Sequence, residues 1–243
     1  MNEWSLIIFT LALQIAAGGV AALALTERLG GGRAGYAALG LFAALGAAGL
    51  FFSLTHLGDM TGAYRALTHV STSWLSREAW LALVFVGLTI LCAFWARQGK
   101  TTACLLPLAA LAGVLFVFAS AAVYAESVME KWTSICPYAD FFAATLLTGP
   151  LLAACLRRDD GSGLCVLRAL FSLGVILFVL NIGFFGSTPQ APLALVRLGL
   201  TALGLVAGLG ALLAAAPARR AAVAGVVLLV LGEGAGRYMF FAA

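Results

Sequence analysis

Two histidines, two arginines and two acidic residues lie together in one polar stretch, THLGDMTGAYRALTHVSTSWLSRE, which spans residues 55–78. His56 stands near its beginning and Glu78 at its end. An imidazole, with an ordinary pKa of about 6.5, and a partly buried carboxylate are suited to exchanging protons near neutral pH. The residue types therefore point first to proton chemistry at these two positions.

The remainder of the sequence determines where this stretch lies. Of 243 residues, 63% are hydrophobic and only 10% are charged, and the mean hydropathy is +1.06. A water-soluble domain cannot cover such a composition with polar surface. About 20 helical residues cross a bilayer core of about 30 Å. Eight apolar runs reach this length, near residues 4–25, 35–56, 78–96, 103–124, 139–156, 165–185, 193–214 and 220–241.

These runs lack the alternation of polar and apolar residues that marks the strands of a membrane barrel. The predicted fold is therefore all-α, a bundle of eight transmembrane helices in a single membrane domain over residues 1–243. The predicted location is the bacterial cytoplasmic membrane.

The basic residues orient the bundle, because short cytoplasmic loops collect Lys and Arg. One set of loops holds nine of the fourteen: Arg28, Arg33, Arg97, Lys100, Arg157, Arg158, Arg168, Arg219 and Arg220. The opposite side holds five: Arg65, Arg77, Lys131, Arg197 and Arg237. We therefore expect both termini and the polar stretch on the outer, periplasmic side. The net charge of +4 then reflects orientation, and no basic stripe with interleaved aromatics indicates a nucleic-acid partner.

The hairpin between the second and third spans brings His56 and Glu78 to the same side of the membrane. Oxidation of a quinol releases two electrons and two protons, so its site needs a proton acceptor and an apolar slot. His56 and Glu78 are suited to the proton chemistry, and Trp74 or Phe52 to part of the slot. The alternative is structural: His56 caps the carbonyl groups at a helix end, and Glu78 stands at a helix start because the helix dipole favours an acidic residue there, with Ser76 as the N-cap.

Other polar residues leave two interpretations open. Asp59 and His69 are typical of a solvated loop, and Arg65 and Arg77 also suit lipid phosphates. Glu233 and Arg237 are four residues apart, so they share a helix face and are within reach of an ion pair. Alternatively, Arg237 faces the same cavity as His56 or docks a partner. Tyr124 and Glu126 end the fourth span on this side.

The sequence predicts no haem and no iron–sulfur cluster within this protein. Its five cysteines form no C-x-x-C pair, which argues against a structural zinc site or an iron–sulfur cluster. The only two histidines are 13 residues apart, with one in a polar loop, which disfavours bis-histidine haem. A redox role therefore requires a partner that accepts the electrons.

Several segments resemble the membrane anchor subunit of dimethyl sulfoxide reductase. MNEWSLIIFTLALQIAAGG is similar to the family's start, where EWPLxxFT precedes a Gln and a patch of small residues. THLGDMTGAYRAL and STSWLSRE resemble its HLG…RA…S.LS.E segment, VYAESVMEKW its Tyr-containing span end, and GRYMFF its closing GR…FY motif. Family members commonly carry a Pro shortly after HLG, where this sequence reads HLGDMTGA.

The resemblance implies an anchor that holds a molybdopterin catalytic subunit and an iron–sulfur electron-transfer subunit on the outer face. It also implies oxidation of menaquinol near that face. His56 and Glu78 match family positions associated with the quinol and are the expected catalytic pair. Arg65, Trp74, Tyr124 and Arg237 are further candidates for quinol binding. The rival functions are a secondary transporter, which the nearly charge-free midplane disfavours, and a purely structural anchor.

Overall fold

Eight long helices and no strand are present in the described part of the computed structural model, which comprises residues 3–56, 64, 67–126, 136–156, 163–185, 191–214 and 218–242. All eight are long and apolar enough to cross a membrane. The predicted all-α class and the eight predicted spans are thus confirmed. The helices are α1 (Glu3–Arg28), α2 (Tyr36–His56), α4 (Trp74–Arg97), α5 (Leu105–Ala125), α6 (Cys136–Leu156), α7 (Leu164–Phe185), α8 (Ala191–Leu213) and α9 (Arg219–Ala242).

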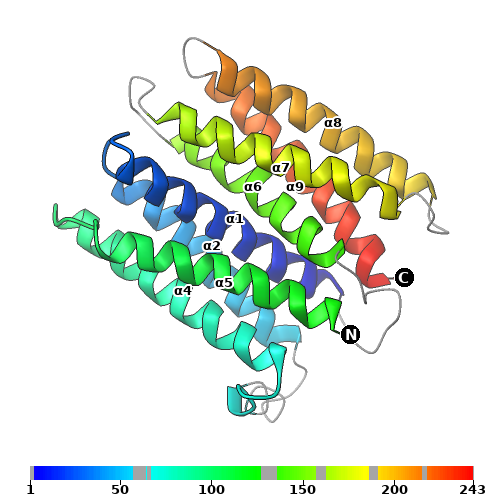
Figure 1. Ribbon diagram of the computed structural model, residues 1–243, viewed down its shortest axis with the longest axis horizontal. Helices are drawn as coiled ribbons and strands as arrows, with labels where there is room; N and C mark the ends of the chain where they lie inside the picture. Colours follow the sequence, from blue (N-terminus) through cyan, green and yellow to red (C-terminus); the bar gives the residue numbers. More distant parts are fainter. Residues whose placement is uncertain are drawn as a thin grey trace.

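The helices run antiparallel to their neighbours in sequence, so the first and last helices both have their free ends at one end of the bundle (Figure 1). We call this end the terminal face. It also holds the end of α2, the start of α4, the end of α5, the start of α6, the end of α7 and the start of α8. His56 and Glu78 are therefore near the same face, as the hairpin predicted.

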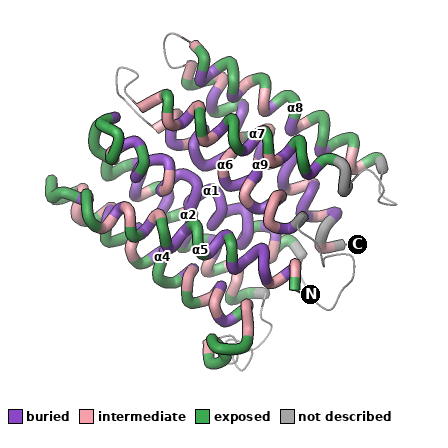
Figure 2. The backbone as a smooth tube through the Cα atoms, viewed as in Figure 1, coloured by how far each residue is buried: buried purple, intermediate pink, exposed green. Residues whose placement is uncertain are grey.

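Helix α1 is the centre of the arrangement, because it packs against α2, α5, α6 and α9. Most residues of α1 are buried, whereas many residues of α4, α7 and α8 are exposed (Figure 2). Large apolar residues are among those exposed on these three helices. Exposed apolar surface on a spanning helix suits contact with lipid. The bundle is thus ordered around α1, and its outermost helices face the membrane.

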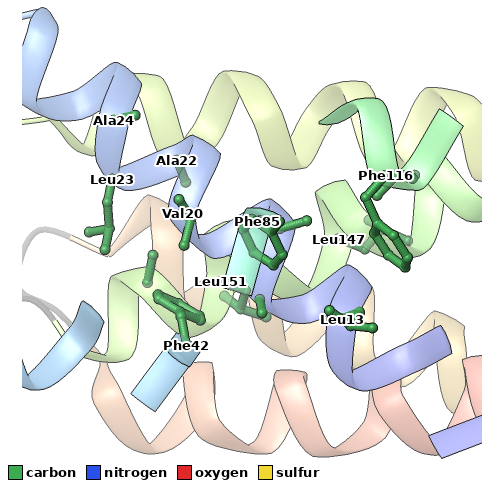
Figure 3. Packing of buried hydrophobic residues seen from close by; sticks show 14 of the residues in the cluster. Leu13, Val20, Ala22, Leu23, Ala24, Phe42, Phe85, Phe116, Leu147 and Leu151 are labelled. Carbon is green, nitrogen blue, oxygen red and sulfur yellow. The ribbon is translucent and has the colours of Figure 1, made fainter. Parts of the chain in front are cut away.

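Large side chains and glycines together close the interior. Phe42, Phe85 and Phe116 are fully buried against leucines and alanines of neighbouring helices (Figure 3). At the α1–α6 contact, a Cβ on Gly149 would lie 2.3 Å from the backbone nitrogen of Gly19. Small residues let membrane helices approach backbone to backbone, where dispersion replaces the hydrophobic effect as the attractive force. Glycine therefore sets the spacing between α1 and α6.

The start of α4 differs from the prediction by four residues. The third span was expected from residue 78, with Ser76 as a helix cap, but α4 begins at Trp74 and Ser76 is buried inside it. The capping position is Ser73, whose side chain makes no capping hydrogen bond. Glu78 is consequently inside the second turn of the helix and not at its first residue.

A buried polar cluster at the terminal face

Nine buried polar side chains from seven helices gather in the terminal half of the bundle. We call them the polar cluster: Gln14 of α1, Glu78 of α4, Ser120 and Tyr124 of α5, Asp140 of α6, Asn181 of α7, Arg197 of α8, and Glu233 and Arg237 of α9. Ionisable groups at membrane depth are costly and are kept mainly where they serve a function. The cluster is therefore the natural place to look for a site.

Asp140 stands at the centre of the ion pairs in the cluster. Its Oδ1 lies 2.5 Å from Nη2 of Arg197 and accepts a hydrogen bond from Nδ2 of Asn181 at 3.0 Å. Its Oδ2 lies 3.6 Å from Nη2 of Arg237. Both carboxylate oxygens thus face positive groups, and the charge-assisted hydrogen bond from Arg197 is of the strong kind. This arrangement stabilises Asp140 as a carboxylate.

Arg237 is fully buried and reaches from α9 to two other helices. Its Nη2 donates to Oε1 of Gln14 at 2.9 Å, and its Cζ lies 3.6 Å from the ring centroid of Phe141. A guanidinium over an aromatic face gains a cation–π attraction, which increases when the pair is desolvated. The guanidinium is therefore held between α1 and α6, with a fixed orientation.

Arg197 crosses α9 over a face of small residues. A Cβ on Gly236 would lie 2.6 Å from Nε of Arg197, and a Cβ on Gly232 would lie 2.5 Å from Oγ1 of Thr201. Any larger residue at these two positions would collide with α8. The glycines of the segment GEGAG thus make the space in which the Arg197 side chain reaches Asp140.

Glu233 is completely buried, and its Oε2 lies 3.7 Å from Nη2 of Arg197. Neither of its oxygens accepts a hydrogen bond from any residue that the structure describes. Glu233 and Arg237 share a face of α9, as their four-residue spacing predicted. The ion pairs that the structure records for them nevertheless run to α8 and α6 instead of to each other.

Glu78 and Tyr124 form the other side of the cluster. Glu78 is buried in α4, where the Ser120 hydroxyl of α5 faces it. Within the described residues, Glu78 Oε1 has no hydrogen-bond partner of good geometry. Tyr124 packs its ring on Phe141 and Phe241 and lies within electrostatic range of both Glu78 and Arg237. Tyr124 is therefore close enough to both Glu78 and Arg237 for their charges to act on it.

Of the six predicted site residues, Glu78, Tyr124 and Arg237 come together in this cluster. Trp74 lies one turn before Glu78 on α4, where Nε1 donates to Oε2 of Glu126 at 2.6 Å and the ring packs edge-on against Phe118. His56 ends α2, but its side chain lies outside the described residues, as do Arg65 and Asp59 entirely. The exposed His69 lies at the terminal face, as expected of a loop residue.

Four members of the cluster that contact its charged groups were not predicted as site residues from the sequence, namely Gln14, Asp140, Asn181 and Arg197. Arg197 was counted with the outer loops, but it lies six residues into α8, about 9 Å along the helix. Each of the four is a single polar residue within an apolar run, as in LALQIAAG and LVRLGL. That interruption of an apolar span is the signal that identifies such residues.

Comparison with known proteins is consistent with this architecture. The family model described as DMSO reductase anchor subunit matches residues 1–185. The C subunit of anaerobic dimethyl sulfoxide reductase from Escherichia coli (strain K12) is 30% identical over 191 residues, which cover 74% of this protein and 66% of the relative. The anaerobic dimethyl sulfoxide reductase subunit YnfH of the same organism is 28% identical over 269 residues, which cover 99% and 94%. No solved structure matches.

The family match covers the first six helices, α1 to α7, and the match to YnfH extends over α8 and α9. Eight apolar helices agree with an integral protein of the cytoplasmic membrane. On this evidence the protein belongs to the family of DMSO reductase anchor subunits.

Proposed function

We propose that this protein is the membrane anchor and quinol-oxidising subunit of a molybdoenzyme complex similar to dimethyl sulfoxide reductase. Family membership supports the anchor role and association with a catalytic and an iron–sulfur subunit. The observation that carries quinol oxidation is Glu78, a buried carboxylate near the terminal face with Ser120 and Tyr124 beside it. The proposed donor is menaquinol, which reaches the site from the lipid.

His56 and Glu78 accept and relay the proton of the quinol. Helices α2 and α4 pack against each other, and these two residues lie on them near the terminal face. His56 takes a proton from the quinol hydroxyl, and Glu78 orients the ring or relays the proton. A positioned acid–base group contributes about 10²–10⁴-fold to such a step. Because Glu78 lies in the second turn of α4, its carboxylate is shielded from bulk water yet close to the terminal face, where the protons are released.

The remaining predicted residues shape the binding site. Trp74 supplies an aromatic wall, since its indole N–H is already engaged by Glu126 and its ring is fixed by Phe118. Tyr124 offers a hydroxyl within electrostatic range of both Glu78 and Arg237, and Arg237 supplies a positive field for the ring oxygens. Arg65, in the segment between α2 and α4, is a further candidate for contact with the quinol.

Electrons leave this protein one at a time to an iron–sulfur cluster of the partner subunit. The excess of basic residues in the opposite loops supports an outward terminal face. The partner subunits then dock outside, and the protons are released on the same side as the site. Under this proposal, the turnover of quinol moves no net charge across the membrane.

The test uses the assembled complex with Glu78→Gln and, separately, His56→Ala. We expect oxidation of a menaquinol analogue to fall at least about 10-fold, at the low end of what an acid–base group contributes. Activity driven by a reduced viologen, which feeds the partner subunits directly, stays unchanged. Glu27→Gln, a carboxylate at the opposite end of α1, serves as the matched control. Full quinol oxidation by Glu78→Gln in a normally assembled complex contradicts the proposal.

A purely structural anchor gives a different result in the same experiment. In that case the variants reduce the amount of complex recovered from membranes. The activity of each recovered complex is then the same with the quinol and with the viologen. The ratio of the two activities therefore separates a docking role from a role in quinol chemistry.

A further inference from the structure

Four ionisable side chains of the polar cluster form a network of opposite charges. Two are guanidinium groups, Arg197 and Arg237, which remain protonated in proteins. The other two are carboxyl groups, Asp140 and Glu233. If both are ionised, the network carries no net charge; if one binds a proton, it carries a charge of +1. The quinol chemistry proposed above uses Arg237 but assigns nothing to the other three residues.

The two carboxyl groups differ in their partners. Asp140 receives a hydrogen bond from Arg197 and another from Asn181, and its second oxygen faces Arg237. Protonation of Asp140 would forfeit these interactions, so its charge is fixed. Glu233 has only the longer contact of 3.7 Å to Arg197, and no hydrogen bond from a described residue reaches either oxygen. Glu233 is therefore the one member of this network whose charge can change at low cost.

Further buried polar atoms of the neighbouring helices also lack hydrogen-bond partners. Nε2 of Gln14, Oγ1 of Thr201 and Nη1 of Arg237 are buried and have no hydrogen-bond partner in the described parts of the protein. Buried polar atoms in proteins are normally satisfied, and a group of them accommodates ordered water. Gln14 and Arg237 belong to the polar cluster with Glu233, and Thr201 Oγ1 lies 2.5 Å from where a Cβ on the adjacent Gly232 would be, so this part of the bundle retains donors and acceptors that a transferred proton can use.

The cluster also links Glu233 with the quinol chemistry. Arg237 lies one turn from Glu233 on α9 and interacts electrostatically with it and with Tyr124. Tyr124 in turn interacts with Glu78. Tyr124 on α5 is therefore within electrostatic range of Glu78 on α4 and of Arg237 on α9, and Arg237 is within range of Glu233. This succession of interactions connects the site proposed for the quinol with Glu233.

We propose that Glu233 is a proton-loading carboxylate, an inference that rests on the proposed quinol oxidation. The quinol gives up two electrons to the partner's iron–sulfur cluster and two protons to this protein. His56 and Glu78 pass on one proton, and the Glu233 carboxylate binds the other to become a neutral acid. The groups that face it are Arg197 of α8, Asp140 of α6 and Arg237 on its own helix. The later loss of the proton to the terminal face restores the neutral network.

The direct test is redox-difference infrared spectroscopy of the purified complex with a menaquinol analogue. Oxidation of the quinol should produce a carbonyl band of a protonated carboxylic acid that shifts in D2O. Glu233→Gln should abolish this band, because the amide cannot bind the proton. Since the amide also mimics the loaded state, quinol oxidation should slow by about 10-fold, while viologen-driven activity is unchanged. The control variant Glu27→Gln should keep both the band and the rate.

Two comparisons keep the inference separate from the proposed function. If Glu78→Gln blocks quinol oxidation while Glu233→Gln keeps the wild-type rate and the band, the role of Glu233 is overturned and the proposed function stands. If both variants oxidise the quinol normally, the proposed function itself fails. If Glu233→Gln does not assemble, Glu233→Asp replaces it. The band should then move in frequency, and an unmoved band overturns the inference.

Discussion

Removal of the central carboxylate is the sharpest test of the charged network. Asp140→Asn leaves two buried guanidinium groups with Glu233 as their only opposite charge in the network. Loss of one partner from a buried ion pair costs about 3–5 kcal/mol, because an uncompensated charge stays behind. An interhelical hydrogen bond in a membrane protein contributes only about 0.6 kcal/mol on average. The leftover charge therefore dominates, and we expect the free energy of unfolding to fall by about 3 kcal/mol.

The measurement is a double-mutant cycle of unfolding free energies in mixed micelles, with Asp140→Asn, Arg197→Gln and the double variant. The double variant retains Arg237 and Glu233, one charge of each sign. It should therefore cost less than the sum of the single variants, with a coupling energy of about 0.5–3 kcal/mol. Arg220→Gln, an exposed arginine on α9, should change stability by less than about 0.5 kcal/mol. Additive single variants would refute the network.

The glycine contacts give two further predictions, both measured as thermal unfolding midpoints in detergent. Gly149→Ala should lower the free energy of unfolding by about 1–3 kcal/mol, and the midpoint with it, because the added Cβ meets the backbone of α1. Gly87→Ala has open space around the added Cβ, so its stability should be unchanged or higher. Gly236→Ala should lower the midpoint by pushing Arg197 away from Asp140. Gly234→Ala, two residues earlier, should leave the midpoint unchanged, because the added Cβ would be 3.9 Å from the nearest atom. Equal effects of the two variants would contradict the packing described for α9.

The spans were predictable because bilayer thickness sets a minimum length for an apolar helix, and the eight runs meet it. The start of α4 was not predictable, because the polar residues Ser76 and Glu78 resemble the end of a loop. The helix continues through them because both are buried, and Glu78 faces Ser120 of the neighbouring helix. Only the packing partner shows that a polar residue there belongs to the interior.

The candidate site was predictable in part for a related reason. The hairpin between spans places His56 and Glu78 near one face, and the family resemblance adds Tyr124 and Arg237. Neither argument reveals Asp140 and Arg197, because a sequence gives distances along the polypeptide but not which helices become neighbours. The contact between α8 and α9, and the packing of α9 on α6, bring these two residues together. Gly236 leaves the space in which the Arg197 side chain reaches Asp140.

The C-terminal hairpin is tied to the remainder of the bundle by the same charges. The family model ends at residue 185, yet Arg197, Glu233 and Arg237 all follow it. Between membrane helices, lipid is as apolar as leucine, so polar contacts and close packing decide where a hairpin docks. A slip of α9 by one turn, about 5.4 Å, would carry Arg237 away from Gln14 and Asp140. The register of α9 and the positive field beside Tyr124 and Glu78 therefore depend on the same contacts, and a protein that ended after α7 would leave Asp140 in the membrane without either guanidinium.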